Sequence, residues 1–288
     1  MRSLGAQGAA QKIYYIPCIV FSPSKDGRMS GDITEFIGDV AYRTYEKRLL
    51  KEVMSGKMPK HVAIIMDGNR RFAQELGWSS IEGHKKGREK LEEVVEWCRD
   101  LGIKILTLFA FSTENLRRSE EEVGILMGMF SENFRRIADD ERVHEHEIRV
   151  QVIGQRELLP KEVREAIAYA EERTKDHDRY ILNLAVAYGG RQEIIRAIKD
   201  LVKDAKAGKI GVDDIDEKEF SSRLYTADLP DPDLILRTSG EERISNFLLW
   251  QLAYSELYFV DVYWPGFRKI DFLRAIRSYQ MRHRRFGT

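Results

Sequence analysis

Asp67 directly follows the apolar stretch HVAIIM (residues 61–66), and the next four residues are small or cationic: Gly68, Asn69, Arg70 and Arg71. Arginine offers bidentate hydrogen bonds to a phosphate or diphosphate, and glycine lets the backbone approach such an anion closely. A carboxylate beside that anion would repel it unless a Mg²⁺ ion lay between them. The segment therefore indicates a phosphate or diphosphate site in which Asp67 handles Mg²⁺.

Three other apolar stretches also end in segments that combine arginine with Ser, Gly or Asn, at residues 112–118, 189–191 and 237–245. In an open parallel sheet the loops that follow the strands meet at one edge, where helix N-termini also present free N–H groups. Taken singly, an arginine after a strand is more typical of a surface salt bridge, and Asp-Gly-Asn of an ordinary turn. The coincidence of four such segments favours an anion site at that edge.

From residue 61 onward, short stretches rich in Val, Ile and Leu alternate with amphipathic patterns of helical period. We expect strands at residues 61–66, 104–111, 149–154, 181–188, 233–237 and 257–264. We expect helices at residues 83–101, 120–139, 160–176, 190–207, 216–224, 245–255 and 269–284. Strands that are apolar on both faces and alternate with helices are typical of a parallel sheet covered by helices. The predicted fold is therefore α/β, with a mainly parallel six-stranded sheet flanked by helices.

The helix predicted over residues 120–139 has a wide apolar face, which comprises Val123, Leu126, Met127, Phe130, Phe134 and Ile137. Packing against the sheet explains a face of this width. A second interpretation is that the face lines a hydrophobic slot. The spacing alone is compatible with both.

We expect residues 58–288 to form one catalytic domain after an N-terminal extension over residues 1–57. Residues 1–35 show no lasting period and are expected to be flexible, whereas residues 36–56 have the pattern of an amphipathic helix. Met29 precedes that helix, and we hypothesise that the natural start lies there.

The composition and net charge restrict which binding partners and which cellular compartment are expected. The 47 Lys and Arg residues balance 47 Asp and Glu residues, so the chain has no overall attraction for nucleic acid and no nucleic-acid partner is expected. Cys18 and Cys98 are too few for a disulfide framework and suit a reducing, cytoplasmic interior. The apolar run at residues 13–21 contains a proline and is too short to span a membrane, which argues against a signal peptide.

Other common sites lack support. The chain contains neither a GxxxxGK[ST] loop nor a GxGxxG fingerprint, so ATP or NAD binding by those loops is not expected. The HEHE segment at residues 144–147 lacks the HExxH spacing and is interpreted as a solvated helix end. A phosphate-binding hydrolase would need a water-activating base or a second metal cluster, and the sequence indicates neither.

Five segments carry a family resemblance: HVAIIMDGNRRFA, FAFSTENLRRSEEEV, NLAVAYGGRQEI, PDLILRTSGEERISNFLLWQLAYSELYF and the terminal RRFG. Together they resemble the cis-prenyltransferase family, the undecaprenyl diphosphate synthases, over about residues 58–288. The resemblance implies a homodimer whose parallel sheet and helices enclose a hydrophobic tunnel. It also implies chain elongation, in which isopentenyl diphosphate adds repeatedly to an allylic diphosphate and each new double bond is cis.

The resemblance further implies roles for single residues. Asp67 and Asn115 would act in catalysis, Asn115 by orienting the substrate or relaying a proton to diphosphate. Asp67 and Glu256 would bind Mg²⁺. The residues implied in binding the two diphosphate substrates are Gly68, Asn69, Arg70, Arg71, Phe72, His84, Ser112, Thr113, Glu114, Arg118, Arg237, Arg243, Ile244 and Ser245. Residues 285–287 would reach the active site of a partner subunit.

Phe72, Leu116 and Ser80 depart from residues common in the family, and Ser80 stands in place of a diphosphate-contacting arginine of bacterial members. The Asn-Arg-Arg form at residues 69–71 resembles the archaeal and eukaryotic branches. The missing arginine favours geranylgeranyl over farnesyl diphosphate as the starter. The implied product is a long, undecaprenyl-like polyprenyl diphosphate, the precursor of a glycosyl carrier lipid, with at most peripheral membrane contact for its release. Two alternatives stay open: the same chemistry on a prenylated ether lipid, and a non-catalytic partner subunit of a heteromeric prenyltransferase.

Overall fold

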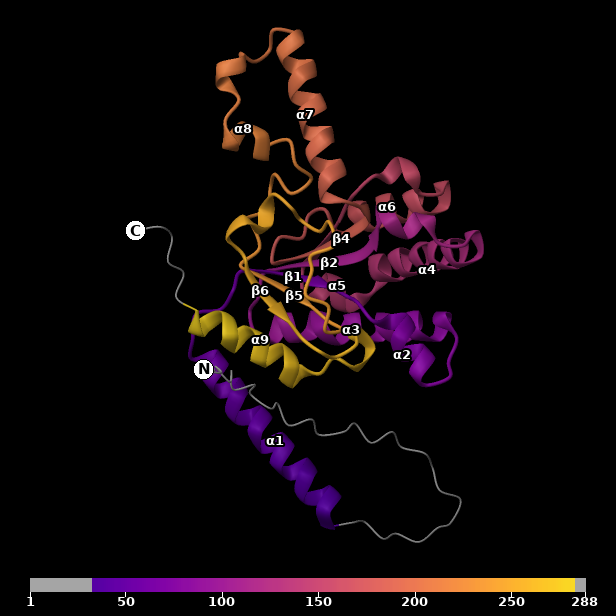
Figure 1. Cartoon of the computed structure of the whole chain (residues 1–288), viewed down its shortest axis with the longest axis vertical. Helices are drawn as coiled ribbons and strands as arrows, with labels where there is room; N and C mark the ends of the chain where they lie inside the picture. Colours follow the sequence, from indigo (N-terminus) through magenta and orange to yellow (C-terminus); the bar gives the residue numbers. More distant parts are fainter. Residues whose placement is uncertain (1–32, 283–288) are drawn as a thin grey trace, which may run out of the picture. The chain divides into compact units, whose positions relative to one another are not determined.

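The computed structural model describes residues 33–282 (Figure 1). The chain forms two units, residues 1–44 and residues 45–288, and the second contains the sheet. No helix within the described part is long and apolar enough to cross a membrane.

Helix α1 (Ile33–Met54) confirms the helix predicted over residues 36–56. Its last turns belong to the larger unit, where Leu49 and Val53 are buried, and the catalytic domain expected over residues 58–288 stays a prediction. The flexibility predicted for residues 1–35 falls almost entirely on residues that the structure does not describe, and residues 33–35 are helical.

The sheet has six strands, and every pairing between neighbours is parallel. The strands are β1 (His61–Ile65), β2 (Ile105–Ser112), β3 (Ile148–Ile153), β4 (Tyr180–Tyr188), β5 (Leu234–Arg237) and β6 (Glu256–Phe259). Their order is β3-β4-β2-β1-β5-β6. The predicted parallel six-stranded sheet is confirmed.

The remaining helices follow the predicted alternation with the strands: α2 (Asn69–Glu75), α3 (Ser80–Asp100), α4 (Glu120–Asp139), α5 (Glu141–Glu145), α6 (Lys161–Thr174), α7 (Gly190–Lys206), α8 (Glu217–Ser221) and α9 (Lys269–Met281). Capping residues next to α3 and α4 in the sequence fix where these two helices begin. Helix α3 begins with a capping box in which Ser79 and Glu82 satisfy each other's backbone N–H groups, and Ser119 caps α4. Helices α7 and α8 extend away from the sheet in Figure 1.

Two local expectations were wrong. Residues 245–255 form turns and a short 3₁₀ helix, η4 (Gln251–Tyr254), in place of the predicted α-helix. Ser245 and Asn246 have left-handed backbone angles, φ 47° and 65°, which an α-helix cannot contain. In addition, the residues after Gly68 are not a loop but the first turn of α2.

The strand order locates the ligand site. The chain places β2 beside β1, then β3 at the edge and β4 between β2 and β3, and β5 returns to the other side of β1. The order therefore reverses between β1 and β5. In parallel sheets the crevice at the carboxyl ends of two such strands is the usual place for a ligand.

Candidate active site

Hydrogen bonds between the Thr238 hydroxyl and the Asp67 backbone connect the segments after β1 and β5. The Asp67 N–H donates a hydrogen bond to Thr238 Oγ1 at 2.9 Å, and the Thr238 hydroxyl donates to the Asp67 carbonyl at 2.7 Å. Thr238 is fully buried, so this pair of bonds is shielded from water. The position of Asp67 at the head of the crevice is therefore set by β5 as well as by β1.

Asp67 is held as a carboxylate by two arginines. Its Oδ2 lies 2.7 Å from Arg237 Nη2 and 3.3 Å from Arg71 Nη2. Burial of the carboxyl group raises its pKa, but hydrogen bonds from Arg237 and Ser239 and the charges of both arginines outweigh that effect and leave the pKa of Asp67 below its usual value. Asp67 is thus ionised at neutral pH.

Arg237 is itself buried, with 4% of its surface exposed, and it connects Asp67 to the loop after β5. Its Nη1 donates to Ser245 Oγ at 2.8 Å and to the Arg243 carbonyl. Its Nε is buried without a hydrogen-bond partner among the described residues. One guanidinium therefore orients the carboxylate on one side and the residues of the predicted isopentenyl diphosphate site on the other.

Arg71 and Arg243 meet at a shared carboxylate. Arg71 Nη1 donates to Glu241 Oε1 at 3.0 Å and its Nη2 donates to Ser239 Oγ at 2.8 Å, and Arg243 pairs with the other oxygen of Glu241. The Arg243 side chain remains 60% exposed. Guanidinium groups from the loops after β1 and β5 therefore converge at one place.

Gly68 is required where it stands. Its φ is 105°, and a β-carbon there would lie 2.6 Å from the Tyr263 ring. Only glycine combines that backbone angle with that contact.

The segment after β2 folds into a 3₁₀ turn, η1 (Thr113–Arg117), that fixes the Asn115 amide. The Ser112 N–H donates to Asn115 Oδ1 at 2.9 Å, and the Asn115 N–H donates to Ser112 Oγ at 3.3 Å. Because a backbone donor requires an oxygen acceptor, the free edge of the Asn115 amide is its NH₂ group. Asn115 therefore offers a hydrogen-bond donor, not a base, to the crevice.

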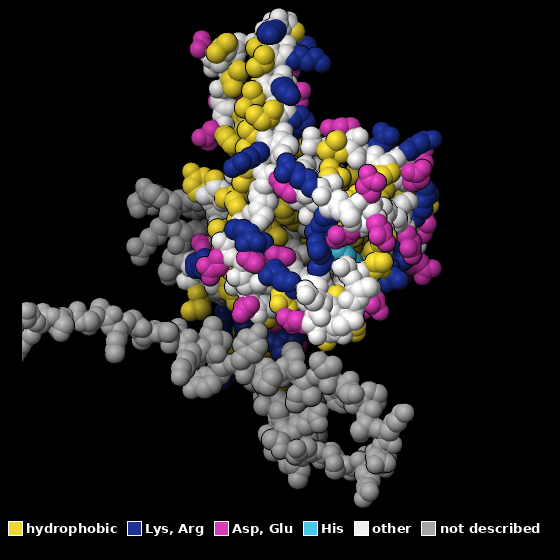
Figure 2. Space-filling model, turned by 45° about the vertical axis from the view of Figure 1, so that its right-hand side comes forward, with side chains coloured by type: hydrophobic (Ala, Val, Ile, Leu, Met, Phe, Trp, Pro, Cys, Tyr) yellow, Lys and Arg dark blue, Asp and Glu magenta, His cyan; other side chains and the backbone are white. Residues whose placement is uncertain are grey.

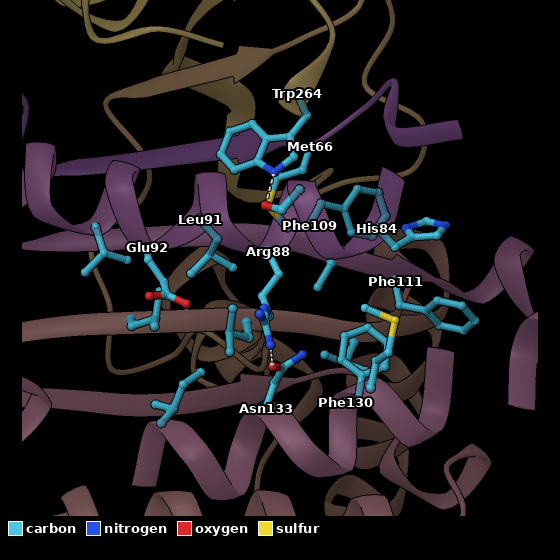
Figure 3. A pocket seen from close by; sticks show the side chains of 18 of the residues that line it. Met66, His84, Arg88, Leu91, Glu92, Phe109, Phe111, Phe130, Asn133 and Trp264 are labelled. Carbon is cyan, nitrogen blue, oxygen red and sulfur yellow. Dashed lines mark hydrogen bonds between the residues drawn. The ribbon is translucent and has the colours of Figure 1, made fainter. Parts of the chain in front are cut away.

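The crevice opens into a cavity of about 440 Å³ between α3, α4 and the sheet. Its wall is largely apolar, and Figure 3 shows Met66, Phe109, Phe111 and Phe130 around it. On α4, residues Leu126, Phe130, Phe134 and Ile137 line this cavity, whereas Val123 and Met127 line a separate groove beside α6. The predicted hydrophobic slot is confirmed for the first of these two sets.

Four residues that line this cavity each have a side-chain atom that is buried without a partner among the described residues: Asn69 Oδ1, His84 Nε2, Arg88 Nε and Arg237 Nε. Burial first, and then the charges of Arg118 and Arg70, lower the pKa of His84 to about 4. His84 is therefore neutral at physiological pH.

The structure brings most of the predicted site residues together. Those that line the cavity are Asp67, Asn69, His84, Ser112, Asn115, Arg118, Arg237, Arg243 and Ser245. The other predicted binding residues adjoin these in the sequence but do not line the cavity: Gly68, Arg70, Arg71, Phe72, Thr113, Glu114 and Ile244. The terminal segment 285–287 lies outside the described residues.

Glu256 does not join Asp67 within one chain. It is the first residue of β6 and pairs in register with Leu234, which pairs with Val62 near the start of β1. At about 3.3 Å per residue, Asp67 lies five residues further along, roughly 16 Å toward the opposite edge of the sheet. Glu256 instead accepts a hydrogen bond from Arg282 at 2.8 Å. The parallel register therefore separates the two residues within one chain, and the metal role of Glu256 stays a prediction.

Arg88 was missed by the sequence reasoning, although a signal for it exists. It lies four residues after His84 on α3, and residues at that spacing share one face of a helix. Its Nη1 contacts Asn133 Oδ1 on α4 at 3.4 Å, across the cavity (Figure 3). Asn246 was missed as well, because the residues around it were taken for a regular helix.

The family-wide sequence profile described as putative undecaprenyl diphosphate synthase matches residues 65–287. The chain belongs to the undecaprenyl diphosphate synthase family. The family resemblance found in the motifs is thus confirmed. Among solved structures of similar fold is lavandulyl diphosphate synthase from Lavandula x intermedia in complex with dimethylallyl diphosphate, with a TM-score of 0.77 and 39% identity over 80% of this chain and 99% of that one.

Two curated relatives in this prenyltransferase family are more similar in sequence. The enzyme from Pyrococcus abyssi is 58% identical over 86% of this chain and 94% of its own length. The enzyme from Thermoplasma acidophilum is 56% identical over 88% of this chain and 99% of its own length. Both are named tritrans,polycis-undecaprenyl-diphosphate synthase (geranylgeranyl-diphosphate specific).

Proposed function

We propose that this chain elongates geranylgeranyl diphosphate by sequential cis addition of isopentenyl diphosphate. The product is a long polyprenyl diphosphate of undecaprenyl type, the precursor of a glycosyl carrier lipid. The observation that carries the proposal is the junction of the Asp67–Arg237 pair with an apolar cavity. A charged head group and a hydrocarbon tail on one molecule match those two environments. The activity named for the relatives from Pyrococcus abyssi and Thermoplasma acidophilum supports it.

The two diphosphates occupy different parts of the crevice. Asn69, Arg70 and Arg71 bind the allylic diphosphate beside Asp67. Arg237, Arg243 and Ser245 bind isopentenyl diphosphate. Arginine suits both sites because its planar fork binds phosphate oxygens in pairs.

The reaction breaks the bond between C1 of the allylic substrate and its diphosphate oxygen. The double bond of isopentenyl diphosphate supplies the electron pair for the new carbon–carbon bond to C1. Arg70 and Arg71 stabilise the charge that grows on the departing diphosphate. The Asn115 NH₂ group orients the substrate, and the proton lost from C2 of the isopentenyl unit passes to the departing diphosphate, since a neutral amide is a poor base.

The donor set near Asp67 fits Mg²⁺. The described residues contain no group of three or more Asp, Glu, His or Cys side chains that could hold a metal. Mg²⁺ commonly binds through one or two carboxylates plus substrate phosphates and water, and an ionised Asp67 beside a diphosphate meets that requirement. When bound, the ion neutralises charge on the leaving diphosphate.

The starter length follows from apolar burial. Each buried CH₂ contributes about 0.8 kcal/mol, so the five extra carbons of a C20 starter over a C15 starter are worth at most roughly 4 kcal/mol in the cavity. Farnesyl diphosphate remains the alternative starter, and a prenylated ether lipid remains the alternative acceptor.

A second copy of the chain completes the assembly as a homodimer. Helix α7 exposes Ile195, Ile198 and Val202, and the segment after it exposes Val212 and Ile215. Figure 2 shows hydrophobic side chains gathered on this arm. Apolar residues spaced along one helix face and left in water are typical of an interface. We place the protein in the cytoplasm, with at most peripheral contact to the membrane for product release.

The test is incubation of the purified full-length chain with labelled isopentenyl diphosphate, Mg²⁺ and a C10, C15 or C20 starter, followed by chain-length analysis. The C20 starter is expected to give the highest kcat/KM. No elongation by the chain alone would contradict the proposal and favour the non-catalytic subunit. A clear optimum at C15 would overturn the starter assignment but keep the reaction.

A further inference from the structure

We propose that Asn246 is a positioning residue that holds the isopentenyl diphosphate site and the Asn115 segment at a set separation. This inference rests on the proposed function. It concerns a residue on the irregular segment after β5, next to Ser245 and outside the set of residues predicted to bind substrate.

The Asn246 side chain and backbone connect three segments. Its Oδ1 accepts a hydrogen bond from the Arg191 N–H at 2.9 Å, and its carbonyl accepts one from the Gly190 N–H at 2.7 Å. Its Nδ2 donates to Glu114 Oε1 and to Gln192 Oε1, both at 3.1 Å. The amide orientation is fixed, because the Arg191 N–H needs an oxygen acceptor and the Glu114 carboxylate needs a donor.

Gly189 allows this convergence. A β-carbon at Gly189 would lie 2.3 Å from Gln192 Oε1, 2.7 Å from Asn246 Nδ2 and 2.8 Å from Thr113 Oγ1. The segment after β2, the start of α7 and the loop after β5 therefore meet around one residue that has no side chain. This gives the Gly189-Gly190 pair a structural purpose distinct from a nucleotide-binding loop.

The loop that Asn246 holds is strained. Ser245, Asn246 and Leu248 have φ values of 47°, 65° and 43°, a left-handed region that side chains other than those of Gly, Asn and Asp rarely adopt. Such conformations persist only where surrounding contacts determine them. Ser245 Oγ accepts the hydrogen bond from Arg237, so the strain lies at the proposed isopentenyl diphosphate site.

Asn246 therefore adjoins a residue of each of the two segments that are proposed to hold the substrates. On one side it is bonded through the chain to Ser245. On the other it binds Glu114, which precedes Asn115 in η1. A small displacement between bound reactants has a large effect on rate, since the reacting carbons must meet in a narrow geometry.

A pair of substitutions separates the side chain from the backbone. Asn246→Gly keeps the left-handed angle accessible and removes the side-chain bonds, whereas Asn246→Ala removes the same bonds and also opposes the angle. Both variants are expected to raise KM for isopentenyl diphosphate by about tenfold or more, with KM for the allylic starter within about twofold of the wild type. A residue with only a structural role would instead lower Tm and leave both KM values unchanged.

A double-mutant cycle tests the Glu114 contact directly. Asn246→Asp places like charges together, while Asn246→Asp combined with Glu114→Gln reverses donor and acceptor and restores the hydrogen bond. We expect the Asn246→Asp substitution to reduce kcat/KM at least about fivefold less in the Glu114→Gln background than in the wild type. Additive effects in the cycle would overturn the inference, as would an unchanged KM for isopentenyl diphosphate in Asn246→Gly.

The proposed function and this inference can fail separately. The proposed function fails if the wild-type chain does not elongate any starter. The inference is then tested by calorimetric binding of isopentenyl diphosphate alone. Weaker binding to Asn246→Gly than to the wild type supports it, and equal binding contradicts it.

Discussion

Asp67 and Arg237 are separated by 170 residues in the chain, yet Asp67 Oδ2 and Arg237 Nη2 lie 2.7 Å apart where β1 and β5 end side by side. The arginine is almost fully buried and the carboxylate is partly open to the crevice. Removal of either partner leaves a charge that the site was built to balance. Substitution of either residue is therefore expected to affect both the activity of the site and the stability of the fold.

Asp67→Asn is expected to lower kcat by about 10³-fold or more, because the substitution keeps the shape and removes the charge that attracts Mg²⁺. Elongation of the C20 starter is the measurement. Asp178→Asn, at an exposed position, is the matched control and should retain wild-type activity. Near-normal turnover in Asp67→Asn would remove this carboxylate from the mechanism.

Ile137→Trp is expected to shorten the products, since Ile137 lines the cavity on α4 and a larger ring there takes up space that a growing chain needs. The measurement is the chain-length distribution at saturating isopentenyl diphosphate. Val123→Trp, on the same helix but in the separate groove beside α6, is the control and should leave the distribution unchanged. Equal distributions for both variants would argue against this cavity as the product site.

His61 should make the protein sensitive to acid. Its Nδ1 lies 2.7 Å from the Pro230 carbonyl and its Nε2 lies 2.7 Å from Thr107 Oγ1, so the neutral ring is fully bonded. Burial lowers the pKa of His61 to about 4, against the smaller raising effect of the Pro230 carbonyl. The unfolded chain, with an ordinary pKa near 6.5, takes up a proton first as the pH falls.

The contribution of the neutral His61 ring to stability is therefore fully present above about pH 6.5 and is lost as the pH falls toward 4. The change in the free energy of unfolding is roughly 3 kcal/mol. Urea unfolding across this pH range measures it. His61→Gln should reduce the slope, and the slope that remains comes from His84, whose pKa is also lowered to about 4, and from carboxyl groups such as Asp67 whose pKa is lowered in the folded chain. An identical slope in wild type and variant would contradict the assignment.

Ile198→Glu is expected to convert the proposed homodimer to monomer, because it places a charge in the middle of the exposed apolar face of α7. Sedimentation velocity is the measurement. Lys203→Glu changes charge at an exposed position on the same helix outside the row of Ile195, Ile198 and Val202, and serves as the control. Dimers of equal stability in both variants would place the interface elsewhere.

Much of this protein could be predicted from local patterns. Residues 62–66 are apolar throughout and residues 181–188 are apolar apart from Asn183, a pattern typical of strands covered on both faces, so the parallel sheet could be predicted from the sequence. Asp67, Asn115 and Arg237 were found for the same reason, since each ends a strand or follows one within a few residues, and strand ends meet at one edge.

The positions of Glu256 and Asn246 were decided only by tertiary structure. The motif that contains Glu256 runs through β5 to the carboxyl edge of the sheet and comes back to the amino edge, because a turn and a 3₁₀ helix reverse the chain before β6. The segment at 245–255 has the apolar spacing of a helix, but contacts with Gly190, Arg191 and Glu114 hold Asn246 in a left-handed conformation.

The sequence by itself thus determined the layers of the fold and the edge at which the polar groups gather, because hydrophobic periodicity is a local property. Which of those groups touch one another depended on strand register and on loop conformations held by partners more than 50 residues away. Such contacts leave no local pattern. The Asp67–Arg237 pair and the Asn246 contacts are of this second kind.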